Sequence, residues 1–455
     1  MLKTPKSALM QYLENKVKSN SPEHIDVTII DASFYFHLLP GAALPTKFGG
    51  ISSHILRKIM ASEGDEIHFV SDKWLSPSIK DCERAARDGS VDSFKITGGN
   101  QKRPANWMSA LRNAGFKESL VKYLVASWSD DCNVKHLGTK TLYANDGDTC
   151  YKYVVEGNSV MKSEESRYSN DHEEADARMF FHVHKITGQK NIVIRMNDTD
   201  CLVIGLGSQS NFCNHKVWIY AGLVSNNTRR YIDMTKLAAN LGESLCSAMP
   251  AYHAFTGCDY TAAFSRKGKV RPLKILEKNA NFQNSFTALG KEQTISDETF
   301  SSIEKFTAEM YGKRKSQFIN DIRLELFLER YKPSGKLDEA RISCLKKMDG
   351  STLPPCHNVL KQKIKRVHLI ANRWNSVDLA TQSPISPTES GWTLGYGSYQ
   401  ILWTEGDLYP KTIDVLQNDK DGSDDEDIND CTDDLAMESD TDADDTTDDE
   451  TENSE

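Results

Sequence analysis

The chain has 455 residues, of which 38% are hydrophobic, and this is enough apolar material for one large domain with additions or for two smaller ones. Its formal net charge of −10 at pH 7 averages two unlike regions, because residues 418–455 contribute −18 and the rest of the chain carries +8. The sequence contains neither a window of 18 apolar residues nor a start with the apolar core of a signal peptide, so we expect no membrane segment.

The first half of the chain alternates β-prone runs with helix-forming ones. After a helical N-terminal segment (1–23), helical patterns cover residues 49–64 and 173–187. Strands that alternate with helices predict an α/β fold with a central, mostly parallel twisted sheet flanked by helices. The β-prone runs are HIDVTII (24–30), DEIHFV (65–70), KNIVIRM (190–196) and HKVWIYAG (215–222).

A long polar insertion separates the second and third of these runs. It covers about residues 73–170 and contains a predicted helix at 118–128. Insertions of this length are typical of functional lids or arches, and disorder is the alternative. We expect an arch-like insertion within a core that spans 24–285.

Helical additions follow the core. Residues 297–311, 318–331 and 338–348 read as amphipathic helices within a helical extension (286–350). A basic helix (356–374), preceded by LPP, and a tryptophan-bearing segment complete residues 351–415. Residues 416–455 form an acidic tail that we expect to be disordered. This tail either keeps the protein soluble or competes with a polyanionic substrate for the basic surface.

Carboxylates follow three of the β-prone runs, and others lie in DHEEADAR and HAFTGCDY. In open α/β sheets the ligand site lies outside the carboxyl ends of the strands, so these groups would meet at one edge. Each alone is also explained as a turn or helix cap, and Asp171 with Glu174 fits a capping box. Together they would repel one another without a counter-charge, and hard oxygen ligands favour Mg²⁺ or Mn²⁺. The seven are Asp31, Asp72, Glu174, Asp176, Asp198, Asp200 and Asp259.

The ordered segments IIDAS, FVSDK, EEADAR, NDTDCLVIG and FTGCDYTAAFSRKGK resemble the acidic motifs of the flap endonuclease-type 5′-nucleases, which have a PIN-like fold. The resemblance covers roughly residues 24–280. It implies two ions that clamp an in-line displacement at phosphorus. Asp176 stands where the family has Glu, which shortens its reach by one methylene. The first ion would be held by Asp31, Asp72, Glu174 and Asp176, and the second by Asp198, Asp200 and Asp259.

A second resemblance covers about residues 3–410. It is to uncharacterised, often multi-copy animal proteins that share HEEADxR, TD at strand ends, HAFTGCD, and LPP before a basic helix. Their multiplicity suggests a mobile-element origin. Many of them end in a cysteine-rich segment, where this chain has its acidic tail.

Basic residues supply candidate substrate contacts. Lys80, Arg84 and Arg87 share one helix face by their spacing, and the resemblance implies that they approach the scissile phosphate. The alternative is a solvated face paired with neighbouring acids. In SRKGKVRP (265–272), the backbone and side chains around Gly268 are candidates for phosphate contacts, and an ordinary basic loop is the alternative. The side chains concerned are Arg266, Lys267 and Lys269.

Four further residues and one run have two interpretations each. His172 and His253 flank acidic motifs, and each is either a metal ligand or an ordinary helix-end histidine. Trp74 and Trp107 would stack on bases or pack in the core. The run KQKIKRVH (361–368) is a nucleic-acid or import segment, or a solvated helix face.

The preferred hypothesis is a divalent-metal-dependent nuclease that cleaves DNA, with RNA as the second choice, by a two-metal mechanism. We expect a monomer inside the cell, and the intracellular location follows from the ten cysteines, which form no CxxC pair and indicate reduced thiols. The substrate class and basic runs such as GKRKS (312–316) predict a nuclear location. One alternative is a catalytically weak or inactive PIN-like scaffold that binds nucleic acid or protein. Another is a metal-dependent phosphatase for small substrates.

Overall fold

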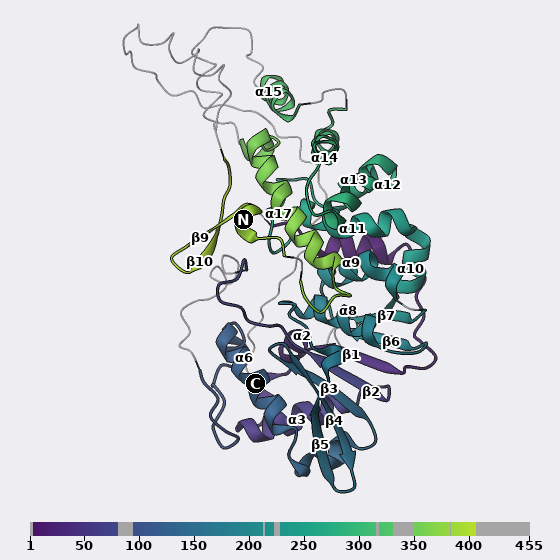
Figure 1. Ribbon diagram of the computed structural model, residues 1–455, viewed down its shortest axis with the longest axis vertical. Helices are drawn as coiled ribbons and strands as arrows, with labels where there is room; N and C mark the ends of the chain where they lie inside the picture. Colours follow the sequence, from purple (N-terminus) through teal and green to yellow (C-terminus); the bar gives the residue numbers. More distant parts are fainter. Residues whose placement is uncertain are drawn as a thin grey trace, which may run out of the picture. The chain divides into compact units, whose positions relative to one another are not determined.

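One sheet of eight strands organises the chain (Figure 1). The structure, a computed structural model, describes residues 3–80, 94–212, 214–222, 228–314, 318–330, 350–382 and 384–405. The five central strands are parallel, and the strands at both edges are antiparallel to their neighbours. The predicted α/β class, with a mostly parallel sheet and helical additions, is confirmed. In spatial order the strands are β5 (Ser159–Glu164), β4 (Thr149–Glu156), β3 (Thr141–Asp146), β2 (Glu66–Val70), β1 (Val27–Asp31), β6 (Asn191–Arg195), β7 (Lys216–Ala221) and β8 (Arg230–Asp233).

Helices cover both faces of this sheet, because successive side chains of its central strands point to opposite sides. In β1, Ile29 packs into one hydrophobic core and Ile30 into the other. The first core is covered by α8 (Ala175–Lys185), α9 (Thr199–Ser208), α10 (Met234–Leu241) and α11 (Glu243–Thr256). The second is covered by α2 (Ala32–His37), α3 (Phe48–Met60), α5 (Trp107–Ala110), α6 (Ala114–Ser127) and α7 (Val134–Leu137).

The first core continues into the helices of both chain ends. Leu9, Phe306 and Trp374 belong to the same hydrophobic cluster as the sheet residues, so the predicted boundary near residue 285 does not coincide with a break in the core. Helices were predicted correctly at 297–311, 318–331 and 356–374, whereas the one at 338–348 lies outside the described residues. These elements are α1 (Ser7–Glu14), α12 (Val270–Glu277), α13 (Ala280–Lys291), α14 (Asp297–Met310), α15 (Ile319–Arg330) and α17 (His357–Asn375).

The predicted arch-like insertion at 73–170 is corrected by the structure. Its described part adds β3, β4 and β5 to the sheet and α5 to α7 to the second core. The polar character that suggested a lid comes from edge strands, whose outward residues are solvated. In β4, for example, Tyr153 is buried, whereas the adjacent Lys152 is partly exposed. Lys162 of β5, which pairs with Tyr153, is also partly exposed.

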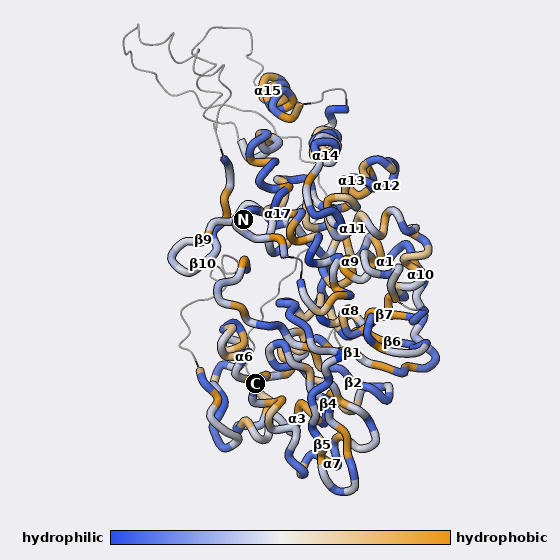
Figure 2. The backbone as a smooth tube through the Cα atoms, viewed as in Figure 1, coloured by the Kyte–Doolittle hydropathy of each residue, from blue (hydrophilic) through white to orange (hydrophobic). Residues whose placement is uncertain are grey.

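The basic run at 361–368 is only partly exposed, so it is not a continuous solvated helix face or a continuous nucleic-acid segment. Lys363 and Arg366 are buried, and both donate to backbone carbonyls, Lys363 to Ala262 and Arg366 to Leu402. In Figure 2, α17 carries hydrophobic and hydrophilic residues in alternation, as expected for a helix with one face in the core.

Short elements complete the described residues. After α17, β9 (Trp392–Gly395) and β10 (Ser398–Ile401) form an antiparallel hairpin. None of the helices in the described ranges is long and apolar enough to cross a membrane. The 3-10 helices lie at Gly41–Ala43, Asp131–Asn133, Ser166–Tyr168, Gln209–Asn211, Gly350–Thr352 and Pro387–Glu389.

Candidate functional site

Aspartates mark the points where the central parallel strands end and helices begin. Asp31 is the last residue of β1 and caps α2, accepting a hydrogen bond from the Phe34 amide at 3.1 Å. Asp198 follows β6 and caps α9, with Oδ1 accepting from the Asp200 amide at 3.0 Å. These aspartates are therefore both helix caps and members of one edge of the sheet, so the two interpretations of the sequence are compatible.

Asp72, which follows β2, connects this edge to the start of α8. Its Oδ1 accepts from the Ala175 amide at 2.9 Å, and Oδ2 accepts from the Ser33 hydroxyl at 3.0 Å. Glu174 is the N-cap of α8, and Asp176 lies in the first turn. The predicted capping box is wrong: Asp171 accepts from the Gln382 amide, and the carboxylate of Asp72 caps α8 instead.

The carboxylates are close enough to shift one another's protonation. Burial raises the pKa of Asp31 to about 7, and the charge of Asp72 adds to the effect. Burial also raises the pKa of Asp176 well above its ordinary value, with further contributions from Asp198 and Asp31. The pKa of Asp198 is raised by burial and then by Asp200. Asp72 contacts Ser33, close to Asp31, and Ala175, between Glu174 and Asp176; Lys6 joins Asp200 to Asp259. With Asp198 bonded to the Asp200 amide, the seven predicted carboxylates form one carboxylate cluster.

Lys80 supplies positive charge on one side of this carboxylate cluster. Its ammonium pairs with Glu174 and lies 5.2 Å from the centre of the Tyr260 ring. Burial opposes the charge, but Glu174, Asp72 and then Asp259 outweigh burial and raise the pKa of Lys80 above its ordinary value. Arg84 and Arg87, predicted on the same helix face, lie outside the described residues.

Lys6 supplies positive charge on the other side, between Asp200 and Asp259. Its Nζ is 2.8 Å from Asp200 Oδ2 and 2.8 Å from Asp259 Oδ1. His253 Nε2 is 2.7 Å from the second oxygen of Asp200. Because burial, Lys269 and Lys6 hold the pKa of His253 well below its ordinary value, the imidazole is neutral and donates this bond. Sequence reasoning missed Lys6, since nothing local distinguishes it from other lysines in a charged amphipathic start.

The basic loop at 265–272 is only partly available to a ligand. Lys269 is 1% exposed, and its ammonium donates to the His253 carbonyl and the Thr256 hydroxyl, each at 2.9 Å. The prediction that Lys269 contacts phosphate is therefore wrong. Lys267 is half-buried over the Tyr311 ring, at 3.9 Å from its centre, whereas Arg266 and Gly268 are exposed with φ of 55° and 56°.

The remaining candidates outside the cluster have structural roles. His172 is buried, with Nε2 2.8 Å from the Leu379 carbonyl. Trp107 is buried in the second core, and Trp74 packs against that core from its margin. Trp374 had no predicted role beyond the basic helix, yet its indole N–H donates to Glu174 at 3.3 Å. It thereby connects α17 to the cluster.

The carboxylates fit a divalent cation to different degrees. Asp31, Asp176 and Asp198 are hard oxygen donors, and none of them forms an ion pair with a basic side chain within the described ranges. Both oxygens of Asp200 are engaged by Lys6 and His253. Among the described residues, no three or more His, Cys, Asp or Glu side chains are placed so that they could hold a metal ion together. The first three carboxylates thus fit a cation by their chemistry, whereas the pair Asp200–Asp259 does not.

Comparison with models of known protein families gave no match for this chain, and comparison with curated proteins gave none either. The functional assignment therefore depends on the chemistry of the site.

Proposed function

We propose that this chain is a divalent-metal-dependent nuclease of the flap endonuclease type that hydrolyses phosphodiester bonds. The observation that carries the proposal is the gathering of seven carboxylates, from β1, the ends of β2 and β6, the starts of α8 and α9, and the loop after α11. A purely structural edge has little use for so many acids, because ionised carboxylates in partly buried positions repel one another.

The cation position in this proposal is the part of the cluster without a basic partner. Asp31, Asp176 and Asp198 would hold Mg²⁺ or Mn²⁺, which favour oxygen ligands. The bound ion would stabilise charge on a phosphoryl oxygen and promote ionisation of water. Burial, followed by the charges of neighbouring carboxylates, raises the pKa values of Asp31 and Asp176, and a bound divalent cation would offset both effects.

Lys80 is the proposed phosphate-binding group of the protein itself. Its ammonium is fixed by Glu174 and attracted by Asp72, so it remains charged at the edge of the cluster. In that position it would orient a phosphodiester and neutralise the charge that develops on it. Arg266 and Gly268 are exposed in the turn of the basic loop, and they remain candidates for contacts with the phosphate backbone of a nucleic acid.

DNA is the preferred substrate and RNA the second choice. The net charge of +8 outside residues 418–455 favours a polyanion. The nuclear location stays a prediction that rests on this choice of substrate.

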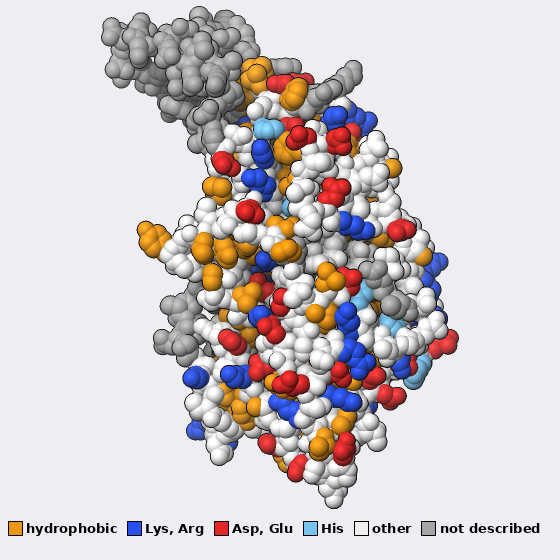
Figure 3. Space-filling model, in the orientation of Figure 1, with side chains coloured by type: hydrophobic (Ala, Val, Ile, Leu, Met, Phe, Trp, Pro, Cys, Tyr) orange, Lys and Arg blue, Asp and Glu red, His pale blue; other side chains and the backbone are white. Residues whose placement is uncertain are grey.

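A second candidate function is a scaffold of the same fold that binds nucleic acid or protein without turnover. Two observations favour it: Lys6 neutralises part of the cluster, and Lys269 is directed into the protein. On the face shown in Figure 3, acidic and basic side chains are interspersed rather than collected into a basic groove. A scaffold of this kind would retain binding and lack cleavage.

The deciding experiment is cleavage of labelled single-stranded, duplex and 5′-flap DNA, and of RNA, in Mg²⁺ or Mn²⁺. The double variant Asp198→Asn/Asp200→Asn should lose at least a hundredfold in rate, because it removes charge from the cluster without changing side-chain size. Asp297→Asn is the matched control, since Asp297 also lies in a first helical turn but is exposed on α14. Absence of cutting, with equal nucleic-acid binding by all three proteins, would favour the scaffold.

A further inference from the structure

The charge between Asp200 and Asp259 comes from the chain itself. Lys6 Nζ lies at hydrogen-bond distance from one oxygen of each, 2.8 Å in both cases. We propose that Lys6 is a built-in counter-ion that takes the place of the second metal ion of a two-metal site. In terms of the proposed function, on which this part of the inference rests, the site then has one divalent-cation position and one permanent ammonium.

The backbone of Lys6 is fastened to the same segment that its side chain neutralises. The Thr199 hydroxyl donates to the Lys6 carbonyl at 3.1 Å, and Thr199 lies between Asp198 and Asp200 in the sequence. The backbone carbonyl of Lys6 and its ammonium are therefore both bonded to the segment Thr199–Asp200, and this fixes the ammonium next to the carboxylate. Lys6 precedes α1 directly, so the position of that helix also sets the position of the ammonium.

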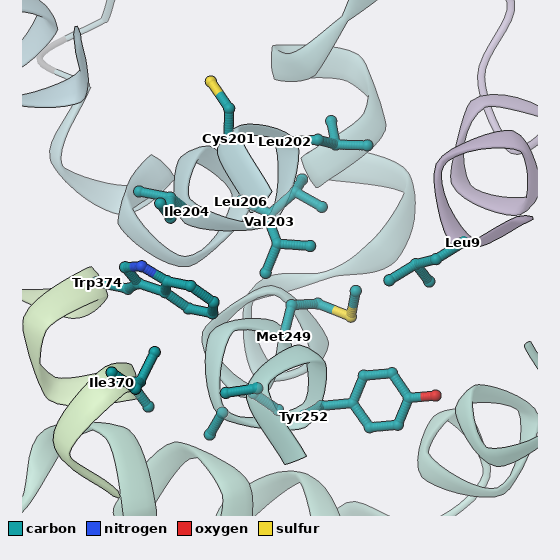
Figure 4. Packing of buried hydrophobic residues seen from close by; sticks show 14 of the residues in the cluster. Leu9, Cys201, Leu202, Val203, Ile204, Leu206, Met249, Tyr252, Ile370 and Trp374 are labelled. Atoms are coloured by element: carbon teal, nitrogen blue, oxygen red, sulfur yellow. The ribbon is translucent and has the colours of Figure 1, made fainter. Parts of the chain in front are cut away.

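Helix α1 is anchored in the core and along its outer face. Leu9 and Leu13 are fully buried, and Figure 4 shows Leu9 pointing toward Met249 of α11. Tyr12 donates to Glu277 at 3.0 Å, and Arg230 pairs with Glu14 at 2.5 Å. The lysine is consequently presented by a packed helix that touches α9, the helix that carries Asp200.

The geometry of this contact is that of an ammonium and excludes Mg²⁺ at the same point. Mg²⁺ requires oxygen ligands at about 2.0–2.1 Å in a near-octahedral arrangement. Lys6 keeps its two carboxylate oxygens at 2.8 Å, and the other oxygen of Asp200 accepts from neutral His253 at 2.7 Å. A metal at this position would have to displace Lys6, and it could bind the second oxygen of Asp200 only by breaking the hydrogen bond to His253.

The test is to count Mn²⁺ ions bound by the full chain, by calorimetric titration and by electron paramagnetic resonance of unbound Mn²⁺. Lys6→Met should bind one more ion per chain than the parent, because it removes the ammonium from the position and keeps an unbranched side chain. Lys6→Arg, which keeps the charge, should bind the same number as the parent. Lys16→Met is the matched control, since Lys16 follows the same helix and pairs with Glu277 outside the cluster. Weak binding to the acidic tail is common to all variants and cancels in the difference.

A second variant keeps the test independent of the folding of Lys6→Met. Asp259→Asn should leave the number of ions bound by the parent unchanged, because Asp259 pairs with Lys6 rather than with a metal. Loss of one ion in Asp259→Asn would overturn the proposal, as would equal counts in Lys6→Met and the parent. Cleavage is a separate readout: a parent that fails to cut while Lys6→Met gains one ion would contradict the nuclease and leave the role of Lys6 supported.

Discussion

At the scale of single residues, the carboxylate cluster is a set of groups whose protonation is set by their neighbours. Asp31 is the clearest case, because burial and the charge of Asp72 raise its pKa from 3.8 to about 7. The folded state thus holds a proton on Asp31 at pH values where the unfolded chain has released it. Stability must then fall as the pH rises from about 4 to about 7, at up to about 1.4 kcal/mol per pH unit.

We therefore expect Asp31→Asn to stabilise the metal-free protein at pH 8 and to leave its stability at pH 4 almost unchanged. The gain should be up to about 4 kcal/mol, which is about three pH units at about 1.4 kcal/mol each, because asparagine keeps the cap of α2 and carries no charge to desolvate. Denaturant unfolding in the presence of a chelator, measured from pH 4 to pH 8, checks this expectation.

Asp146→Asn is the control for Asp31→Asn, since Asp146 ends the parallel strand β3 and lies outside the cluster. Its unfolding curves should follow those of the parent at every pH. Parallel pH profiles for the parent and Asp31→Asn would contradict the assigned environment of Asp31. Mn²⁺ should stabilise the parent more than Asp31→Asn, because ligand binding to the folded state shifts the unfolding equilibrium.

At the scale of elements, the site depends on the helix that precedes the first strand. Helix α1 is short, at eight residues, so tertiary packing rather than helix propensity must hold it in place. Its buried side chains pack in the first core together with those of α9 and α12. The position of Lys6 is therefore a consequence of the packing of α1.

Leu9→Ala should test this dependence. Leu9 is 0% exposed, and its truncation should lower the free energy of unfolding by about 2–5 kcal/mol through lost burial and a residual cavity. It should also let Mn²⁺ compete better at Asp200 and Asp259, since Lys6 loses its support. Denaturant unfolding and Mn²⁺ titration give the two readouts.

Leu379→Ala is the matched control for Leu9→Ala, because Leu379 is 54% exposed and its truncation should change stability by less than about 0.5 kcal/mol. If Leu9→Ala were as stable as this control, α1 would not be anchored as described. A large loss of stability with no change in Mn²⁺ binding would show that the packing of α1 does not control metal binding at Asp200 and Asp259.

The elements also show what local sequence could predict. An aspartate after a run such as IVIRM is a local pattern, so Asp31, Asp72 and Asp198 were found from the sequence. Strands β4 and β5 were missed because antiparallel edge strands expose polar residues. Their mixture of polar and apolar residues is therefore as polar as that of a surface insertion. The contacts of Lys6 with Asp200 and Asp259 span 194 and 253 residues of sequence, so no local signal could reveal them.

At the scale of the whole molecule, the chain combines opposite charges in separate stretches of sequence. Residues 418–455 contribute −18 to the formal charge, and the remainder carries +8. Attraction of a polyanion by the basic part and its repulsion by the acidic part act together over distances set by the Debye length, about 10 Å at 0.1 M salt. The acidic stretch should therefore weaken nucleic-acid binding, and most strongly at low salt.

A chain truncated after residue 415 should bind single-stranded and duplex DNA about tenfold more tightly than the full chain at 50 mM salt, with the difference shrinking towards 300 mM. The slope of log Kd against log salt should be steeper for the truncated chain, because its phosphate contacts no longer compete with tail carboxylates. Fluorescence anisotropy over a salt series measures both quantities. A full-length variant with Asn and Gln in place of the tail acids separates charge from length. If that variant bound as weakly as the parent, steric exclusion rather than charge would be the cause.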